Sequence, residues 1–292
     1  MERKNFLKLL TLIPVAGFAM KLTDLKSLTD PLPTTPEMPV FFFGHGSPMN
    51  AIEQNEFTLG WKKSIKNLPK PNAILCISAH WETKGTFVTA MEKPKTIHDF
   101  GGFPQALFDV QYPAPGDLAL ANDIKATIKK TTVEHDLEWG LDHGTWSILN
   151  VIYPEANIPV LQMSIDYTQS AQYHYDLAKE LAALRKKGVL IIGSGNIVHN
   201  LGMLAWNQPE KGFDWAIEAN TKVKNFITTR DHKALINFRD QGPEFKLSIP
   251  TPEHYLPLLY VLALQGEKQN ASFFNDKTVM GSIAMTGVQI SA

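Results

Sequence analysis

The chain has 292 residues, of which 44% are hydrophobic and 20% are charged, and its formal net charge is −1. This composition indicates a globular protein with a large core, and the balanced charge argues against a surface for nucleic acid. The single cysteine, Cys76, excludes an internal disulfide and a cysteine-based zinc site, so the nine histidines carry more information.

The N-terminal part of the chain has the pattern of an export signal. Residues 1–20 begin with a basic run and continue with an apolar stretch that is too short to cross a membrane comfortably as a helix. The run RKNFLK resembles a twin-arginine signal with Lys4 in place of the second arginine. The alternatives are an amphipathic helix or an uncleaved anchor.

We expect residues 21–37, which end in a proline-rich stretch, to form a spacer before a domain at residues 38–292. On the export interpretation, the protein is periplasmic and the mature chain has no stable membrane insertion. A cytoplasmic location is the alternative.

From residue 38 onward, apolar runs that end in turn residues alternate with helical patterns. In chain order, the sequence predicts a strand at 39–43, a helix at 61–68, strands at 72–81 and 85–92, a long loop at 96–117, a helix at 117–131, a strand at 158–166, a helix at 170–188, a strand from 189, helices at 213–230 and 253–266, and a closing strand at 282–290. Such alternation indicates an α/β fold whose sheet is at least partly parallel.

Several histidines occur where a predicted strand gives way to a loop. His45, His80 and His199 each follow an apolar run, and His254 opens a predicted helix. In an α/β sheet these positions meet at one edge, where ligands bind. Imidazoles that converge without cysteines are typical of an Fe(II), Mn(II) or Zn(II) site. The sequence therefore predicts a metal site at the edge of the sheet.

Each histidine also has a plain structural explanation when it is considered alone. His45 suits a loop side chain packed on Pro48, His80 suits a half-buried hydrogen-bonding residue, and His254 suits a helix start. The run GSGNIVH has the look of a nucleotide-binding loop, but Val198 occupies the place of the third glycine. The joint placement of the histidines is what favours a metal.

The remaining histidines divide into two groups. His98 and His143 lie among glycines and aromatic residues, which suits a pocket wall or acid–base catalysis, with a hydrogen-bonding loop residue as the alternative. His135, His174 and His232 have charged neighbours in the sequence, so we expect them at the surface.

Six motifs carry a family resemblance. FGHGSPM, SAHWET, IHDFGGFP, LDHGTWS, GSGNIVHNL and PTPEHYLPLLY resemble, in this order, the motifs of the class III extradiol ring-cleavage dioxygenases, most closely the 4,5-DOPA branch of bacteria and plants. The resemblance extends over residues 38–290. It implies a single α/β catalytic domain at 38–292, with a central mixed, mostly parallel sheet flanked by helices and a metal at the sheet edge.

The resemblance also implies a set of metal ligands. His45 and His80 match the two early ligands of the family, and His254 matches the later ligand of the DOPA branch. In protocatechuate-type relatives the later ligand is a carboxylate, which leaves the choice between Glu253 and His254 open. His199 matches a histidine that is an acid–base catalyst in some members and a fourth ligand in zinc-loaded ones.

The catalytic and substrate-binding residues follow from the same motifs. His199 is expected to take a proton from the substrate and return it, with the help of His143. Ser47, Trp81 and His98 are expected to contact the substrate. The candidate aromatic wall of the pocket consists of Phe43, Trp81, Phe100, Phe103 and Trp146.

The activity that the resemblance implies is extradiol opening of a catechol ring by O₂, which gives a muconic semialdehyde. The cofactor would be a divalent metal. Fe(II) would support catalysis, and Zn(II) is the alternative ion, often found bound in its place. The alternatives are a Zn(II) hydrolase of an amide or ester and a periplasmic metal-binding protein. The sequence leaves the identity of the catechol, its cleavage position and the choice between monomer and dimer open.

Overall fold

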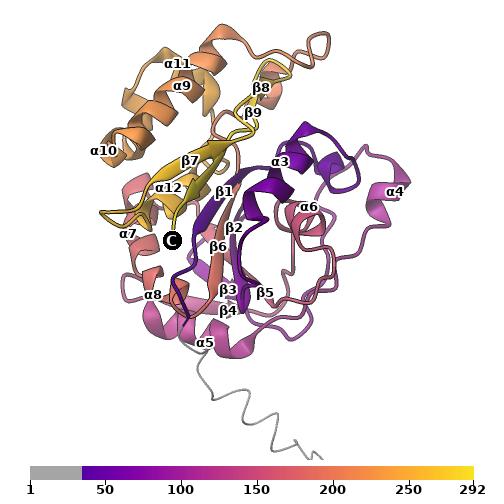
Figure 1. The fold of residues 1–292 in the computed structure, drawn as a ribbon, viewed down its shortest axis with the longest axis vertical. Helices are drawn as coiled ribbons and strands as arrows, with labels where there is room; N and C mark the ends of the chain where they lie inside the picture. The colour runs from indigo at the N-terminus through magenta and orange to yellow at the C-terminus, as the bar shows by residue number, and fades with distance from the viewer. Residues whose placement is uncertain (1–34) are drawn as a thin grey trace, which may run out of the picture. The chain divides into compact units, whose positions relative to one another are not determined.

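The apolar run after the proline-rich stretch forms an inner strand of an eight-stranded sheet. The computed structural model describes residues 35–292, and this run is β1 (Val40–Gly44) (Figure 1). The strand order is β4-β3-β5-β2-β6-β1-β10-β7. The predicted signal at 1–20 lies outside the described residues, as does residue range 21–34 of the predicted spacer.

Four neighbouring strands, β5, β2, β6 and β1, run parallel to one another, whereas β10 and β7 add an antiparallel edge. The other strands of this sheet are β2 (Ala73–Thr83), β3 (Thr86–Thr89), β4 (Val133–Asp136), β5 (Val160–Asp166), β6 (Val189–Gly195), β7 (Ala271–Phe274) and β10 (Gly287–Ile290). A separate antiparallel pair consists of β8 (Thr278–Val279) and β9 (Ile283–Ala284). The predicted mixed, mostly parallel sheet is confirmed.

Helices cover both faces of the sheet (Figure 1). The first face carries α3 (Glu56–Ile65), α4 (Gln105–Phe108) and α6 (His143–Ile152). The second face carries α5 (Leu118–Thr127), α7 (Ala171–Lys179), α8 (Ala182–Arg185) and α12 (Leu256–Ala263). Helices α9 (Asp214–Thr228), α10 (His232–Ile236) and α11 (Pro243–Ser248) contribute side chains to the same core from beyond the sheet, near β8 and β9 (Figure 1). Short 3₁₀ turns are η2 (Pro48–Ala51), η3 (Leu201–Met203) and η4 (Phe238–Asp240).

Strand geometry explains why β1 is apolar at every position before its glycine. Side chains alternate between the two faces of a strand, so Phe41 and Phe43 enter the core under α3 and α6, and Val40 and Phe42 enter the other core. Strands that are covered on both faces are continuous apolar runs. Within residues 35–292, no helix is both long enough and apolar enough to cross a bilayer.

Some predicted elements differ from the observed ones. The predicted helix at 170–188 is divided into α7 and α8, with Leu181 fully buried at the break. The predicted closing strand at 282–290 is divided into β9 and β10. The sequence prediction missed strands β4, β7 and β8 and helices α6, α10 and α11, and α4 lies within the predicted loop at 96–117. Helix α6 begins in HGTW, a run that resembles a loop, and it is stabilised by Asp142, whose carboxylate accepts a hydrogen bond from the backbone N–H of Thr145.

Candidate metal centre

Three histidines from distant parts of the sequence meet beside the ends of the parallel strands. His45 directly follows β1, His80 lies near the end of β2, and His254 lies in the turn before α12. One ring nitrogen from each lies within 4.8 Å of the others. The Nε2 atoms of His45 and His80 are 3.3 Å apart. The common edge of the sheet therefore does bring these side chains together.

An irregularity in β2 positions His80. Between the pairs Ile77↔Met163 and Glu82↔Ile165, β2 advances five residues while β5 advances only two. Extra residues in one strand form a bulge, which releases side chains from the regular alternation and is common beside active sites. His80 lies in this stretch, so it belongs to an irregular continuation of the strand and not to a loop after it.

Two glycines allow the backbone to come close to the ligand histidines. A Cβ atom on Gly195, at the end of β6, would lie 2.1 Å from the carbonyl oxygen of His254. That carbonyl accepts a hydrogen bond of 2.9 Å from the N–H of Asn196. A Cβ atom on Gly144 would lie 2.8 Å from Cδ2 of His80. Larger residues at either position would displace a candidate ligand.

The second ring nitrogen of each of these three histidines faces an oxygen atom. His45 Nδ1 lies 2.9 Å from Ser194 Oγ, His80 Nδ1 lies 3.5 Å from Asp99 Oδ2, and His254 Nδ1 lies 3.1 Å from Glu253 Oε1. Oxygen partners on the second nitrogen are typical of histidines that bind metals, because they fix the tautomer and orient the ring.

These contacts leave the Nε2 atoms for a ligand. Within the described part of the chain, Nε2 of His254 is a buried polar atom without a hydrogen-bond partner. Such an orphan is costly unless something binds it. Three imidazole nitrogens suit a divalent ion such as Fe(II) or Zn(II). The residues at this site therefore fit the metal that the sequence predicts.

Burial keeps the three imidazoles neutral. Burial and then the neighbouring His80 hold the pKa of His45 well below its usual value, and burial and then His199 do the same to the pKa of His254. Burial and then His143 lower the pKa of His80 to about 3. Only a neutral imidazole has the lone pair that binds a metal. All three are thus in the binding form at neutral pH.

His143 and His199 flank the three-histidine group on different sides. The ring of His143 lies 3.9 Å from that of His80, between ring centres. The ring of His199 stacks on that of His254, with centres 3.5 Å apart and an interplanar angle of 10°. Burial lowers the pKa of His199 to about 4, against the opposing effect of Glu253.

Two further groups of possible ligand atoms share residues with the group formed by His45, His80 and His254. One consists of His80, Asp99 and His143, and the other of His199, Glu253 and His254. His199 does not belong to the group formed by His45, His80 and His254. The site is thus a continuous array of five histidines.

The predicted substrate residues make their observed contacts with residues outside this array. Ser47 is exposed, and its hydroxyl accepts a hydrogen bond from the N–H of Met49. Trp81 is buried against Trp139, with ring centres 5.7 Å apart. His98 Nε2 lies 3.0 Å from the carbonyl oxygen of Val110. Their roles in substrate binding stay predictions.

The aromatic residues that were candidates for the pocket wall have different environments. Phe100 is half-buried, and its ring centre lies 5.5 Å from that of His143. Phe103 packs on Phe100 at 5.4 Å. Phe43 is a fully buried core residue that contacts Trp61. Among these candidates, Phe100 is therefore the residue whose ring packs against a histidine of the array.

The predicted surface position of three other histidines is partly wrong. His174 is fully buried in α7, and its Nδ1 lies 2.9 Å from the hydroxyl of Tyr260 on α12. His135 and His232 are half-buried. Charged neighbours in the sequence are poor guides here, because only one face of a helix such as α7 meets solvent.

Sequence reasoning missed two residues that contact the array. Asp99 directly follows His98 in the motif IHDFGGFP, in which His98 was the predicted functional residue. Ser194 lies in the run GSGN, which was considered as a nucleotide loop. In the sequence, each of these residues is marked only as a short polar residue within a histidine-containing motif. The fold shows which histidine its side chain contacts.

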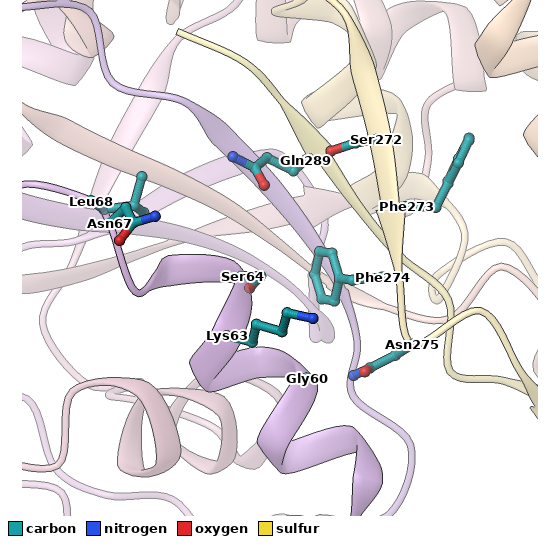
Figure 2. A pocket seen from close by; sticks show the side chains of 10 residues that line it. All are labelled: Gly60, Lys63, Ser64, Asn67, Leu68, Ser272, Phe273, Phe274, Asn275 and Gln289. Atoms are coloured by element: carbon teal, nitrogen blue, oxygen red, sulfur yellow. The ribbon is translucent and has the colours of Figure 1, made fainter.

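A surface cavity of about 580 Å³ lies elsewhere, between α3 and the strands β7 and β10 (Figure 2). Its lining includes Lys63, Phe274 and Gln289. No histidine of the array lines this cavity, so it is separate from the candidate metal centre.

Comparisons with known proteins identify the family of this chain. A family model for the "Catalytic LigB subunit of aromatic ring-opening dioxygenase" matches residues 39–287. A "4,5-DOPA dioxygenase extradiol" of Escherichia coli is 46% identical over 265 residues, which cover 89% of this chain and 97% of that protein. A protein of the same name from Beta vulgaris is 36% identical and covers 81% and 90%, respectively.

A solved structure has the same fold. It is that of an uncharacterised protein from Escherichia coli K12, with a TM-score of 0.76 and 41% sequence identity, and the match covers 87% of this chain and all of the other. Together with the family match and the two curated relatives, this shows that the chain is an enzyme of the LigB family, the class III extradiol dioxygenases, which use a divalent metal.

Proposed function

We propose that this enzyme opens the ring of a catechol with O₂ at a bond next to the diol, and that the product is a muconic semialdehyde. The convergence of the ring nitrogens of His45, His80 and His254 carries the proposal, because it forms a compact donor set for one ion. The names of the relatives support a substrate that resembles DOPA.

The proposed metal is Fe(II), held by His45, His80 and His254. Iron with open coordination positions supplies redox chemistry and stabilises anionic oxygens of the substrate. The three imidazoles contribute neutral donors, so the bound ion would keep its positive charge. A catechol that loses a proton would therefore be attracted to this site.

Proton transfer is assigned to the two flanking histidines. His199 stacks on His254, and its lowered pKa, about 4, leaves its ring neutral at neutral pH, which is the protonation state that a general base starts from. His143 lies against His80 on the other side, and its Nδ1 is engaged by Asp99. Nε2 of His143 is the atom left to exchange a proton. We assign the main acid–base role to His199 and an assisting role to His143.

The substrate ring is proposed to lie against Phe100, which already contacts His143. Ser47, Trp81 and His98 are proposed to contact the remainder of the substrate. Ser47 is the most accessible of the three, because it is exposed two residues after His45. A hydroxyl there suits a polar substituent on the catechol.

Export is part of the same proposal. Residues 1–20 would direct the chain to the periplasm, and a twin-arginine route suits a protein that is moved folded with its metal bound. Cell fractionation of the full chain and of a chain that lacks residues 1–20 tests this. Equal amounts of the two chains in the periplasm would contradict it.

Oxygen consumption tests the activity. The protein is purified without oxygen, loaded with Fe(II), and mixed with a panel of catechols that includes DOPA. We expect O₂ uptake and a yellow ring-opened product, both lost in His199→Ala and in the Zn(II)-loaded protein. Absence of uptake with every catechol, together with Zn(II)-supported hydrolysis of an ester or amide, would contradict the proposal and favour a hydrolase.

A further inference from the structure

One carboxylate, that of Asp99, lies between a candidate metal ligand and a candidate proton-transfer residue. Asp99 Oδ2 is 2.9 Å from Nδ1 of His143 and 3.5 Å from Nδ1 of His80. Asp99 Oδ1 accepts a hydrogen bond of 2.9 Å from the backbone N–H of His143. Both carboxylate oxygens therefore face the start of α6.

The chemistry of these groups fixes the position of the protons. An ionised carboxylate only accepts hydrogen bonds, so Nδ1 of His143 must donate. The ring of His143 then carries its proton on Nδ1, and Nε2 keeps its lone pair. Nδ1 of His80 lies 3.5 Å from the same carboxylate without a hydrogen bond, so there the negative charge favours a proton on Nδ1 by attraction alone. Nε2 of His80 faces His45 at 3.3 Å. One acidic residue thus fixes the tautomer of His143 and favours the matching tautomer of His80.

Asp99 is suited to this task by its surroundings. Its side chain is 17% exposed, and within residues 35–292 its ion pairs are with these two histidines and with no lysine or arginine. Both of its oxygens accept hydrogen bonds from N–H groups of His143, which is the arrangement of an ionised carboxylate.

Asp99 also lies in a segment without regular secondary structure, between the bridge at Thr96 and helix α4. Its two hydrogen bonds to His143 connect this segment to the first residue of α6. The next residue, Phe100, packs on the ring of His143. The carboxylate of Asp99 therefore also helps to orient Phe100, the proposed wall of the pocket.

We propose that Asp99 is a positioning residue that aligns His80 and His143 together, with Nε2 of His80 toward the metal and Nε2 of His143 toward the substrate. The part that concerns the substrate rests on the proposed function. The part that concerns the two tautomers and the metal does not, so the two parts can fail separately.

The test compares Asp99→Asn with Asp109→Asn. The asparagine has one acceptor oxygen for the two N–H donors of His143, and its amide N–H₂ would oppose Nδ1–H of that ring. Such a replacement reverses the tautomer of a catalytic histidine in proteases. Asp109 is an exposed residue on the C-terminal side of α4 whose partner is Gln105, so its variant is a control for the loss of a charge nearby.

The first readout is ¹⁵N NMR of histidine-labelled, Zn(II)-loaded protein, which distinguishes Nδ1–H from Nε2–H without any turnover. We expect Nδ1–H signals for His80 and His143 in the wild type and in D109N, and loss of the His143 signal in D99N. The second readout is Zn(II) affinity by chelator competition. We expect about 10- to 100-fold weaker binding in D99N, as for other partners of metal-bound histidines.

Unchanged tautomers and unchanged Zn(II) affinity in D99N would overturn the proposal. Two Zn(II) ions per wild-type chain and one per D99N chain would also overturn it, because Asp99 would then be a ligand of a second ion. If D99N does not fold, the variant Asp99→Glu decides the question, because it keeps a carboxylate at this position. Retained Nδ1–H signals of His143 in this variant would support positioning. Nε2–H signals together with wild-type Zn(II) affinity would contradict it.

Turnover adds a readout for the substrate part. In the Fe(II)-loaded enzyme we expect D99N to lower kcat with catechol while KM changes little, because the change affects proton transfer and not the binding of the ring. A rise in KM with unchanged kcat would overturn this part. If wild-type protein turns over no catechol, the proposed function fails, and the NMR and affinity results still decide the role of Asp99.

Discussion

His45 Nδ1 lies 2.9 Å from the hydroxyl oxygen of Ser194, and the same hydroxyl lies 2.5 Å from the carbonyl oxygen of Gly144. A hydroxyl has one proton and a carbonyl oxygen can only accept, so Ser194 donates to Gly144. Ser194 must then accept a hydrogen bond from Nδ1–H of His45. This fixes the tautomer of His45 and leaves Nε2 for the metal.

Replacing Ser194 should weaken metal binding. In Ser194→Ala, the ring of His45 loses the acceptor that holds its tautomer, and we expect the Zn(II) affinity to fall about 10- to 100-fold. Chelator competition measures this. The matched control is Ser147→Ala, because the hydroxyl of Ser147 is also buried but has no hydrogen-bond partner in the described structure. Equal affinities of the two variants would contradict the assignment.

His254, and not Glu253, is expected to be the late ligand. Nε2 of His254 is buried without a partner, whereas Glu253 Oε1 already receives hydrogen bonds from Nδ1 of His254 and from Thr251. We therefore expect His254→Ala to lose stoichiometric metal, and Glu253→Gln to retain it with weaker affinity. Metal content after gel filtration measures both. His232→Ala, a half-buried histidine on α10, should keep its metal. Metal loss in E253Q with retention in H254A would reverse the assignment.

Gly144 should not tolerate a side chain. In Gly144→Ala, the new Cβ atom would lie 2.5 Å from the hydroxyl of Ser78 and 2.8 Å from the ring of His80. We expect a loss of about 1–3 kcal/mol in the free energy of unfolding, as for other overpacked sites, together with weaker Zn(II) binding. Urea unfolding and chelator competition measure the two effects. Gly101→Ala is the control, because a Cβ atom there meets nothing within 4 Å. Wild-type behaviour of G144A would contradict the packing argument.

The sequence predicted the sheet well and the detail of the site less well. The strand ends at His45 and His199 were recognisable because apolar runs covered on both faces stop at turn residues. Helix α6 was not recognisable, because its start contains Gly144 and its cap, Asp142, precedes a run typical of loops. The contacts of Asp99 depend on how a segment without secondary structure folds back, which no local pattern encodes.

The same limit applies to the predicted substrate residues, whose roles stay predictions. The motifs that contain Ser47 and Trp81 also contain His45 and His80, respectively. Trp81 stacks on Trp139 from another part of the chain. Proximity in sequence places a backbone near a site, whereas the direction of the side chain depends on long-range packing.

His174 should contribute a pH-dependent term to stability, independent of the metal. Burial lowers its pKa from 6.5 to about 4. Between these values the unfolded chain binds a proton that the folded chain does not, so stability falls as the pH falls, by about 1.4 kcal/mol per pH unit. Stability from this residue is fully present above pH 6.5.

The variant His174→Gln isolates this term. Urea unfolding of metal-free protein between pH 7.5 and 4 should show that wild type loses stability more steeply than H174Q. Histidines of the metal centre contribute equally to both proteins and cancel in the difference. Parallel pH profiles of the two proteins would show that His174 is not held in its neutral form.

The position of the ion tests the central claim most directly. A crystal structure of the Zn(II)- or Fe(II)-loaded protein, with anomalous diffraction at the metal edge, would locate the ion among three overlapping groups of ligand atoms. We predict one ion bound by Nε2 of His45, His80 and His254, at about 2.0–2.1 Å for zinc. An ion between Asp99 and His143, or between His199 and Glu253, would contradict the account of this metal centre.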